Sequence, residues 1–268
     1  MSDSATVSIP ATPIISVKEA SVIFSEGKSK GKLAVNTVSF NVEAKKILGI
    51  VGTSGCGKTT LARAIAGIQP LSSGDILFDG NSIRNMSRTE RIQYSRKVQL
   101  VFQDTLGALN PRMTICDALD EVLKVHRKAE MPSKEKRLAE IKLLLDKVEL
   151  PESVLNCYPH EISGGQRQRI GIARALAVKP QVLIADEPIS ALDVSVQAQI
   201  IKMLAHLIAE EKMTMLFIAH DLAAVRCLCD NIIVMNAGKI EEMGSCNEVY
   251  TSPKSKFTRE LLAAIPSI

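Results

Sequence analysis

Short runs of apolar residues alternate with longer segments of helical periodicity along most of this chain. A run of four or five consecutive apolar residues predicts a strand that is covered on both faces, because such a strand has no polar side. Runs of this kind occupy residues 47–51, 182–185 and 215–219. Strands that alternate with helices predict a mostly parallel α/β sheet.

The segments between these runs carry apolar residues at helical spacing. They predict helices over residues 58–66, 116–128, 134–148, 166–178, 194–211 and, as a short amphipathic helix, 257–265. Gly67 is expected to cap the first of them at its C-terminus. Pro180 ends the helix at 166–178, because proline disfavours helix in the residue before it.

A second pattern is typical of β-structure. Residues 15–23 alternate weakly, residues 33–42 continue as strand, and the stretch EGKSKGK between them predicts a hairpin loop. Residues 70–102 are expected to be β-rich, with a turn and a strand in SSGDILFDG. Residues 232–235 and 239–243 flank Ala237-Gly238 and predict another hairpin.

Composition narrows the class of protein. A chain of 268 residues with 46% hydrophobic and 23% charged residues is typical of one globular domain, and a net charge of +4 gives no argument for nucleic-acid binding. The six cysteines form no C-x-x-C pair, so we expect reduced thiols in a cytosolic protein and no transition metal. The start, MSDSATVSIPATP, predicts a loose arm over residues 1–13 and no secretory signal. No apolar run approaches the ~20 residues of a membrane helix, so the chain is expected to be soluble or to reach a membrane through a partner.

The stretch GTSGCGKTT over residues 52–60 fits the phosphate-binding pattern G-x-x-x-x-G-K-[ST]. It lies between a predicted strand and a predicted helix, which is the context that the motif requires. Backbone N–H groups of such a loop and the N-terminal end of the helix attract phosphate oxygens. The residues expected to bind the nucleotide here are Gly52, Thr53, Ser54, Gly55, Cys56, Gly57, Lys58, Thr59 and Thr60. Lys58 would reach the β- and γ-phosphates, and the Thr59 hydroxyl would ligate Mg²⁺.

The stretch VLIADE places two acids at the end of a predicted buried strand. Ligands bind at the carboxyl ends of parallel strands, so Asp186 is expected to hold Mg²⁺ beside the phosphate loop. Glu187 can polarise the water that attacks the γ-phosphate. The structural alternative is a solvated strand end.

A third motif, ISGGQRQRIGIARAL, contains Ser163, Gly164, Gly165 and Gln166 ahead of a predicted helix. Such a tip can bind an anion, although an ordinary helix cap explains it equally well on its own. The tip stands about 20 residues before VLIADE, in a chain that already has a phosphate loop. We therefore expect it to contact the γ-phosphate of a nucleotide held by another subunit.

Together these motifs resemble the ATP-binding subunit of an ABC transporter, over residues 14 to about 265. The resemblance also rests on VFQDTLGALNP, SALD and IAH, and it departs from the family at Ile162, where leucine is usual. It implies a P-loop NTPase fold with a RecA-like, mostly parallel sheet, an antiparallel β subdomain and a helical signature subdomain at about 105–178. The ATPase domain would span 14–245, and 246–268 would form a short C-terminal extension.

The resemblance implies roles for four more residues. Gln103 would sense Mg²⁺ and the attacking water, and His220 would hold the γ-phosphate. Asp193 would link the two sites of a head-to-tail dimer, in which two ATP molecules are sandwiched between opposed phosphate loops and SGGQ tips. Phe24 would stack on adenine, although a phenylalanine in a β-segment is also a common core residue.

VFQDTLGALNPRMTI and SPKSKFTRELLAAIP resemble the importer ATPases for oligopeptides, dipeptides and nickel or metal–chelate complexes, although Ser255-Lys256-Phe257 replaces the usual His-Pro-Tyr. The resemblance implies two transmembrane permease subunits, a second ATPase in a heterodimer or homodimer, and an external binding protein, with this chain peripheral on the cytoplasmic face of the inner membrane. No iron–sulfur extension and no nucleic-acid partner are expected.

Two other classes remain open. Soluble relatives that act on nucleic acid or ribosomes carry long coiled coils or two copies of the domain, whereas only about 110 residues separate the phosphate loop from SGGQ here. A small-molecule kinase would leave SGGQ and His220 unexplained.

Overall fold

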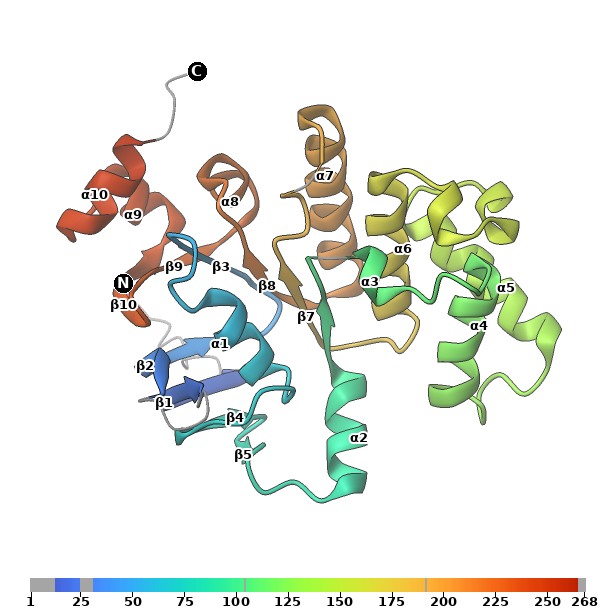
Figure 1. Cartoon of the computed structure of the whole chain (residues 1–268), viewed down its shortest axis with the longest axis horizontal. Coiled ribbons are helices and arrows are strands. Elements are labelled where there is room, and N and C mark those ends of the chain that lie inside the picture. The colour runs from blue at the N-terminus through green and yellow to red at the C-terminus, as the bar shows by residue number, and fades with distance from the viewer. Residues whose placement is uncertain (1–12, 25–30, 104, 191, 265–268) are drawn as a thin grey trace, which may run out of the picture.

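A six-stranded sheet forms the centre of the computed structural model, which describes residues 13–24, 31–103, 105–190 and 192–264 (Figure 1). Its strand order is β10-β9-β3-β8-β7-β6, and every neighbouring pair is parallel except β9 and β10. The strands are β3 (Ile47–Gly52), β6 (Val98–Val101), β7 (Val182–Asp186), β8 (Thr214–Ile218), β9 (Asn231–Asn236) and β10 (Lys239–Ser245). All residues of β3, β7 and β8 are buried, which is why their sequences are almost entirely apolar.

A four-stranded antiparallel sheet packs beside the first, with strand order β2-β1-β4-β5. Its strands are β1 (Ile15–Phe24), β2 (Lys32–Val42), β4 (Ser73–Phe78) and β5 (Asn81–Ser82). Its apolar side chains share one core with α1 and with one face of the central sheet. Most of the hairpin loop predicted between β1 and β2 lies outside the described residues.

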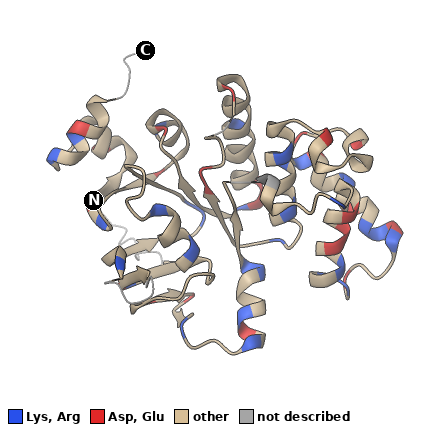
Figure 2. Ribbon diagram, in the orientation of Figure 1, with Lys and Arg blue, Asp and Glu red and all other residues tan. Residues whose placement is uncertain are grey.

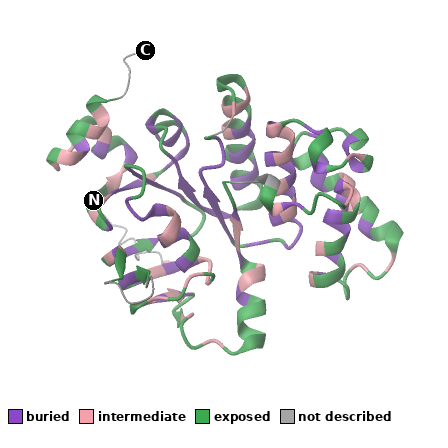
Figure 3. Cartoon of the chain, viewed as in Figure 1, coloured by how far each residue is buried: buried purple, intermediate pink, exposed green. Residues whose placement is uncertain are grey.

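The opposite face of the central sheet is covered by helices, which carry buried residues on the sheet side and exposed residues on the outer side (Figures 1 and 3). The α-helices are α1 (Lys58–Ile65), α2 (Arg88–Lys97), α3 (Thr105–Ala108), α4 (Ile115–His126), α5 (Lys134–Lys147), α6 (Gly164–Leu176), α7 (Val194–Glu211), α8 (Leu222–Leu228), α9 (Cys246–Thr251) and α10 (Lys256–Ala263). Two 3₁₀ turns, η1 (Glu152–Asn156) and η2 (Pro159–Glu161), precede α6. The predicted C-cap is confirmed: Gly67 has φ of +72°, and the N–H groups beyond it return to Arg63 O.

The prediction of β-structure throughout residues 70–102 is wrong in its second half, because α2 lies there. This helix buries only Tyr94, so it shows little apolar periodicity. Its start is nevertheless marked by a capping box, in which Ser87 Oγ accepts from Glu90 N–H and the Glu90 carboxylate accepts from Ser87 N–H. Helix α8 was also not predicted; it begins at Asp221, whose carboxylate accepts from Ala223 and Ala224 N–H.

Charged residues are dense on α2, α4 and α5 and sparse on the central sheet (Figure 2). One ion pair between α4 and α5 is buried: Asp120 and Arg137 are each only 8% exposed, and Arg137 also donates to the carbonyls of Met131 and Pro132. Burial raises the pKa of Asp120, but hydrogen bonds from Lys124 and Arg137 outweigh it and hold the pKa below its usual value.

We expect Asp120→Asn to destabilise the fold by about 3 kcal/mol, because it leaves the Arg137 guanidinium buried without its counter-charge. Since the folded pKa of Asp120 is lowered, its contribution to stability is full above the unfolded pKa of about 4 and is lost as pH falls through the folded pKa. Urea unfolding at pH 7 and at acid pH would measure both effects, with the exposed Asp146→Asn on α5 as control. Equal stability of the two variants at pH 7 would contradict this assignment.

Hydrogen bonds connect β10 to the start of α10. The Glu242 carboxylate, in a residue that is 9% exposed, accepts from the N–H groups of Lys254 and Ser255. The predicted short C-terminal helix is present as α10. The domain boundaries proposed from the sequence stay predictions. No helix in the described part of the chain is both long enough and apolar enough to cross a bilayer.

Candidate active site

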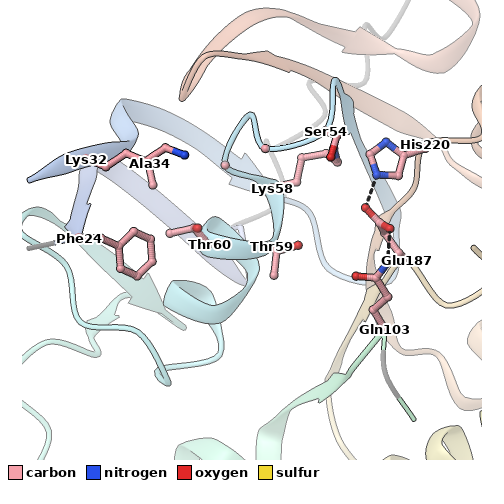
Figure 4. A pocket seen from close by; sticks show the side chains of 12 residues that line it. Phe24, Lys32, Ala34, Ser54, Lys58, Thr59, Thr60, Gln103, Glu187 and His220 are labelled. Carbon is pink, nitrogen blue, oxygen red and sulfur yellow. Dashed lines mark hydrogen bonds and ion pairs between the residues drawn. The ribbon is translucent and has the colours of Figure 1, made fainter. Parts of the chain in front are cut away.

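A pocket of about 330 Å³ opens where β3, β7 and β8 end, with Phe24 at one side and His220 at the other (Figure 4). Strand β3 leads into the phosphate loop, β7 ends at Asp186, and β8 ends two residues before His220. The residues that line the pocket are Phe24, Lys32, Ala34, Ser54, Gly55, Gly57, Lys58, Thr59, Thr60, Gln103, Glu187 and His220. Chain segments from every third of the sequence therefore meet at one edge of the sheet.

Two glycines of the phosphate loop occupy positions that no other residue could take. Gly52 has φ of +152°, and a Cβ there would lie 2.1 Å from Met235 O. Gly57 has φ of +107°, and a Cβ there would lie 2.2 Å from Ala34 O. Both positions combine the left-handed backbone region with a close approach to another strand. The glycines of the phosphate-binding motif are therefore required because the backbones of β9 and β2 pack against Gly52 and Gly57.

The Lys58 side chain is held inside the loop and is only 4% exposed. Its ammonium donates to Gly52 O at 2.9 Å and to Thr53 O at 3.1 Å. These carbonyls stabilise a buried cation in the absence of a carboxylate. Lys58 lines the pocket and is the first residue of α1, so its ammonium and the first N–H groups of the helix both attract an anion.

Thr59 and Asp186 meet on the other side of the loop, with Thr59 Oγ1 donating to Asp186 Oδ1 at 3.1 Å. Burial raises the pKa of the Asp186 carboxyl, and the Thr59 hydrogen bond opposes that shift. A hydroxyl and a carboxylate are oxygen ligands of the kind that Mg²⁺ prefers. Within the described residues no three His, Cys, Asp or Glu side chains gather as a metal site, so Mg²⁺ here would take its other ligands from phosphate and water.

Glu187 lies at the centre of a row of three polar side chains (Figure 4). Gln103 Nε2 donates to Glu187 Oε2 at 2.7 Å, and His220 Nε2 contacts the other carboxylate oxygen. The Glu187 side chain is 10% exposed, whereas that of His220 is 42% exposed and open to the pocket. Both oxygens of the carboxylate are thus contacted by side chains that lie two residues after β6 and two residues after β8.

Phe24 ends β1 and is 39% exposed, with its ring at the far side of the pocket from Glu187. Its cross-strand partner is Lys32, and Lys32 and Ala34 line the same side of the pocket. The sequence interpretation did not single out Lys32 or Ala34. The hairpin register is the feature that could have identified Lys32, because it pairs the last residue of β1, Phe24, with the first residue of β2.

The SGGQ tip and Asp193 do not line this pocket. Ser163 is exposed and caps α6 through a capping box, in which its Oγ accepts from Gln166 N–H and the Gln166 amide oxygen accepts from Ser163 N–H. Asp193 is exposed at the start of α7, and its carboxylate makes no capping hydrogen bond. Gly52, Thr53 and Cys56 belong to the loop but are not among the residues that line the pocket. The structure thus joins the phosphate loop to Gln103, Glu187 and His220 and leaves the SGGQ tip on a separate surface.

Gly165 lies against α7, and a Cβ there would come within 2.6 Å of Val196 Cγ1. Replacing glycine by alanine inside a helix stabilises the helix by about 1 kcal/mol through helix propensity alone. A net loss of stability would therefore reveal the steric clash. We expect Gly165→Ala to cost about 1–3 kcal/mol, because the β-branched Val196 cannot rotate away. Thermal unfolding would show the loss and its rescue by Val196→Ala. Gly164→Ala is the matched control, since its nearest neighbour is the flexible Leu192 at 3.3 Å.

A glycine-rich loop between a buried strand and a helix, with a buried lysine and strand-end acids beside it, defines the class of P-loop nucleotide-hydrolysing proteins. The comparisons narrow this class. A family model described as "ABC transporter" matches residues 35–190, more than half of the chain. The chain belongs to the ABC transporter family, and it is an ATP-hydrolysing subunit of that family.

Curated relatives match nearly the whole chain. The oligopeptide transport ATP-binding protein OppF of Streptococcus mutans is 46% identical over 253 residues, which cover 94% of this chain and 82% of that protein. The dipeptide transport ATP-binding protein DppF of Lactococcus lactis subsp. cremoris is 44% identical over 256 residues, which cover 95% of this chain and 81% of that protein.

Solved structures agree on the fold. The dimeric ATP-binding cassette MJ0796, in a post-hydrolysis state bound to ADP and Pi, superposes with a TM-score of 0.79 at 29% identity and covers 87% of this chain and 98% of its own. CbiO1 from Clostridium perfringens, part of the ABC transporter complex cbiONQ, superposes with a TM-score of 0.77 at 27% identity. The match covers 95% of this chain and 96% of CbiO1. The predicted fold class, a P-loop NTPase with a mostly parallel sheet, is confirmed.

Proposed function

We propose that this chain hydrolyses ATP to power the import of peptides through separate membrane subunits. The observation that carries the proposal is the similarity, at 43–47% identity over most of the chain, to proteins named for oligopeptide, dipeptide or peptide transport. These names favour peptides over nickel or metal–chelate complexes, which the sequence motifs left open.

In the proposed reaction the loop N–H groups and the Lys58 ammonium bind the β- and γ-phosphates of ATP. Glu187 accepts a hydrogen bond from the attacking water and orients it, while Gln103 and His220 fix the carboxylate from both sides. His220 also reaches the γ-phosphate from the rim of the pocket. Phe24 stacks on the adenine at the other side. Mg²⁺, when bound by Thr59 and Asp186, neutralises charge on the phosphates.

We further propose that the site is completed by a second ATPase subunit. The exposed Ser163 and the first N–H groups of α6 would contact the γ-phosphate held by the partner, and Asp193 would approach the partner's site beside it. Support comes from the dimeric state of the solved cassette and from the absence of SGGQ from this chain's own pocket.

Ser163→Arg tests the composite site. The bulky side chain should block ATP hydrolysis by excluding the opposed nucleotide, while ATP affinity in this chain's own pocket stays unchanged. Steady-state ATPase rates and titration with a fluorescent ATP analogue would separate the two effects. Hydrolysis at the wild-type rate would contradict a role for this tip.

The proposed assembly is peripheral on the cytoplasmic face of the membrane, with two permease subunits, a second ATPase and an external binding protein. Co-purification with tagged Glu187→Gln in Mg-ATP, after gentle solubilisation of the membranes, would test it. Recovery of two multi-helix membrane proteins is the expected result. Recovery of only ribosomes or DNA-bound proteins would overturn the proposal in favour of a soluble ATPase.

A further inference from the structure

Ser190 lies next to the row formed by Gln103, Glu187 and His220, three residues after Glu187 and outside the set of residues that line the pocket. Its hydroxyl donates to the carbonyl oxygen of Glu187 at 3.1 Å. The same hydroxyl oxygen accepts from Gln103 Nε2 at 3.4 Å. The Ser190 N–H also donates to the Glu187 carbonyl, at 3.3 Å.

The backbone of Glu187 is in the left-handed region, with φ of +49°. A residue other than glycine pays for this conformation with strain, so neighbouring contacts must hold it. Glu187 N–H donates to Ile218 O at 2.9 Å on one side, and the two Ser190 donors hold the carbonyl on the other. The direction of the Glu187 side chain therefore depends on this short turn.

Gln103, Glu187 and Ser190 form a closed ring of hydrogen bonds. The Gln103 amide nitrogen donates both to the Glu187 carboxylate, at 2.7 Å, and to the Ser190 hydroxyl. The Ser190 hydroxyl in turn donates its own hydrogen bond to the Glu187 carbonyl oxygen. Each of the two amide hydrogens has one partner, which fixes the rotation of the Gln103 carboxamide.

We propose that Ser190 is a positioning residue for ATP hydrolysis: its hydroxyl fixes the Gln103 amide against the Glu187 carboxylate. This proposal rests on the proposed roles of Gln103 and Glu187 in activating water. A hydroxyl suits the position because it donates and accepts at once. Alanine removes both bonds, threonine keeps both, and cysteine retains them only in a weak form.

The test measures ATP hydrolysis by the full chain together with the membrane subunits that co-purify with it. Ser190→Ala should lower kcat about tenfold while the affinity for a fluorescent ATP analogue stays the same. Ser190→Thr should restore most of the rate, and Ser190→Cys should fall between. Ser95→Ala is the matched control, because it removes an exposed hydroxyl that likewise donates to a backbone carbonyl, Ile92 O, far from the pocket.

A double-mutant cycle separates positioning through Gln103 from a general structural effect. In the Gln103→Ala background, Ser190→Ala should cost less than about twofold, because the group that it positions is already absent. Equal losses in both backgrounds, or full activity of Ser190→Ala, would overturn the proposal.

Glu187→Gln, assayed in the same preparation, shows which hypothesis fails. A normal rate in Glu187→Gln would contradict the proposed base, whereas an inactive Glu187→Gln with additive Ser190→Ala and Gln103→Ala losses contradicts only the positioning role. If Ser190→Ala does not fold, the order of rates among serine, threonine and cysteine at this position decides: a cysteine variant as fast as the wild type overturns the proposal.

Discussion

Glu187→Gln is expected to lower the rate of ATP hydrolysis by roughly 10²–10⁴-fold, the usual contribution of a positioned general base. The carboxylate offers two acceptor oxygens, and the structure places Gln103 and His220 against one each. The amide of glutamine keeps the shape but replaces one acceptor with a donor, so the water loses its base and one neighbouring donor loses its partner. ATP affinity should stay nearly unchanged, because the proposed contacts to the phosphates come from the loop and from Lys58.

Single-turnover hydrolysis and equilibrium titration with ATP would measure the two quantities separately. A matched control is Glu210→Gln, the same substitution on the exposed surface of α7, where the carboxylate forms an ion pair with His206. Turnover near the wild-type rate in Glu187→Gln would assign the base to another residue. A large loss of ATP affinity would instead place Glu187 in nucleotide binding.

Lys58→Ala is expected to weaken ATP binding by roughly 10- to 100-fold, since a hydrogen bond to a charged group contributes about 1.5–3 kcal/mol. The ammonium is held inside the loop by the carbonyls of Gly52 and Thr53, where a positive charge attracts the phosphates. Lys58→Arg should fail to restore affinity, because the planar guanidinium cannot enter a position that is 4% exposed and shaped for a compact ammonium.

Isothermal titration with ATP, ADP and AMP would locate the effect along the phosphate chain. The loss should be greatest for ATP and smallest for AMP, since the proposed contacts are to the β- and γ-phosphates. Lys202→Ala, on the exposed side of α7, controls for the removal of one positive charge. An equal loss for all three nucleotides would show that the substitution collapses the loop and that Lys58 has no selective role at the phosphates.

Much of the molecule could be predicted from local patterns. The apolar runs at β3, β7 and β8 identified the central strands because strands covered on both faces tolerate almost no polar residue. The phosphate loop was visible because its backbone conformation admits only glycine at positions such as Gly52 and Gly57. By contrast, α2 was missed: it covers little of the core, and an exposed helix carries no strong apolar period.

The sequence by itself determined the buried central strands, the position of the phosphate-loop motif and the acids at the end of β7, because each of these shows as a local pattern of residues. Only the tertiary structure decided which side chains from distant segments come into contact. Strand order brings Gln103, which follows β6, and His220, which follows β8, against Glu187, and the hairpin register brings Lys32 beside Phe24. The ring through Ser190 depends on a left-handed turn at Glu187 and on a side chain 87 residues away in sequence. Contacts over such separations follow from the packing of whole strands, and no local pattern records them.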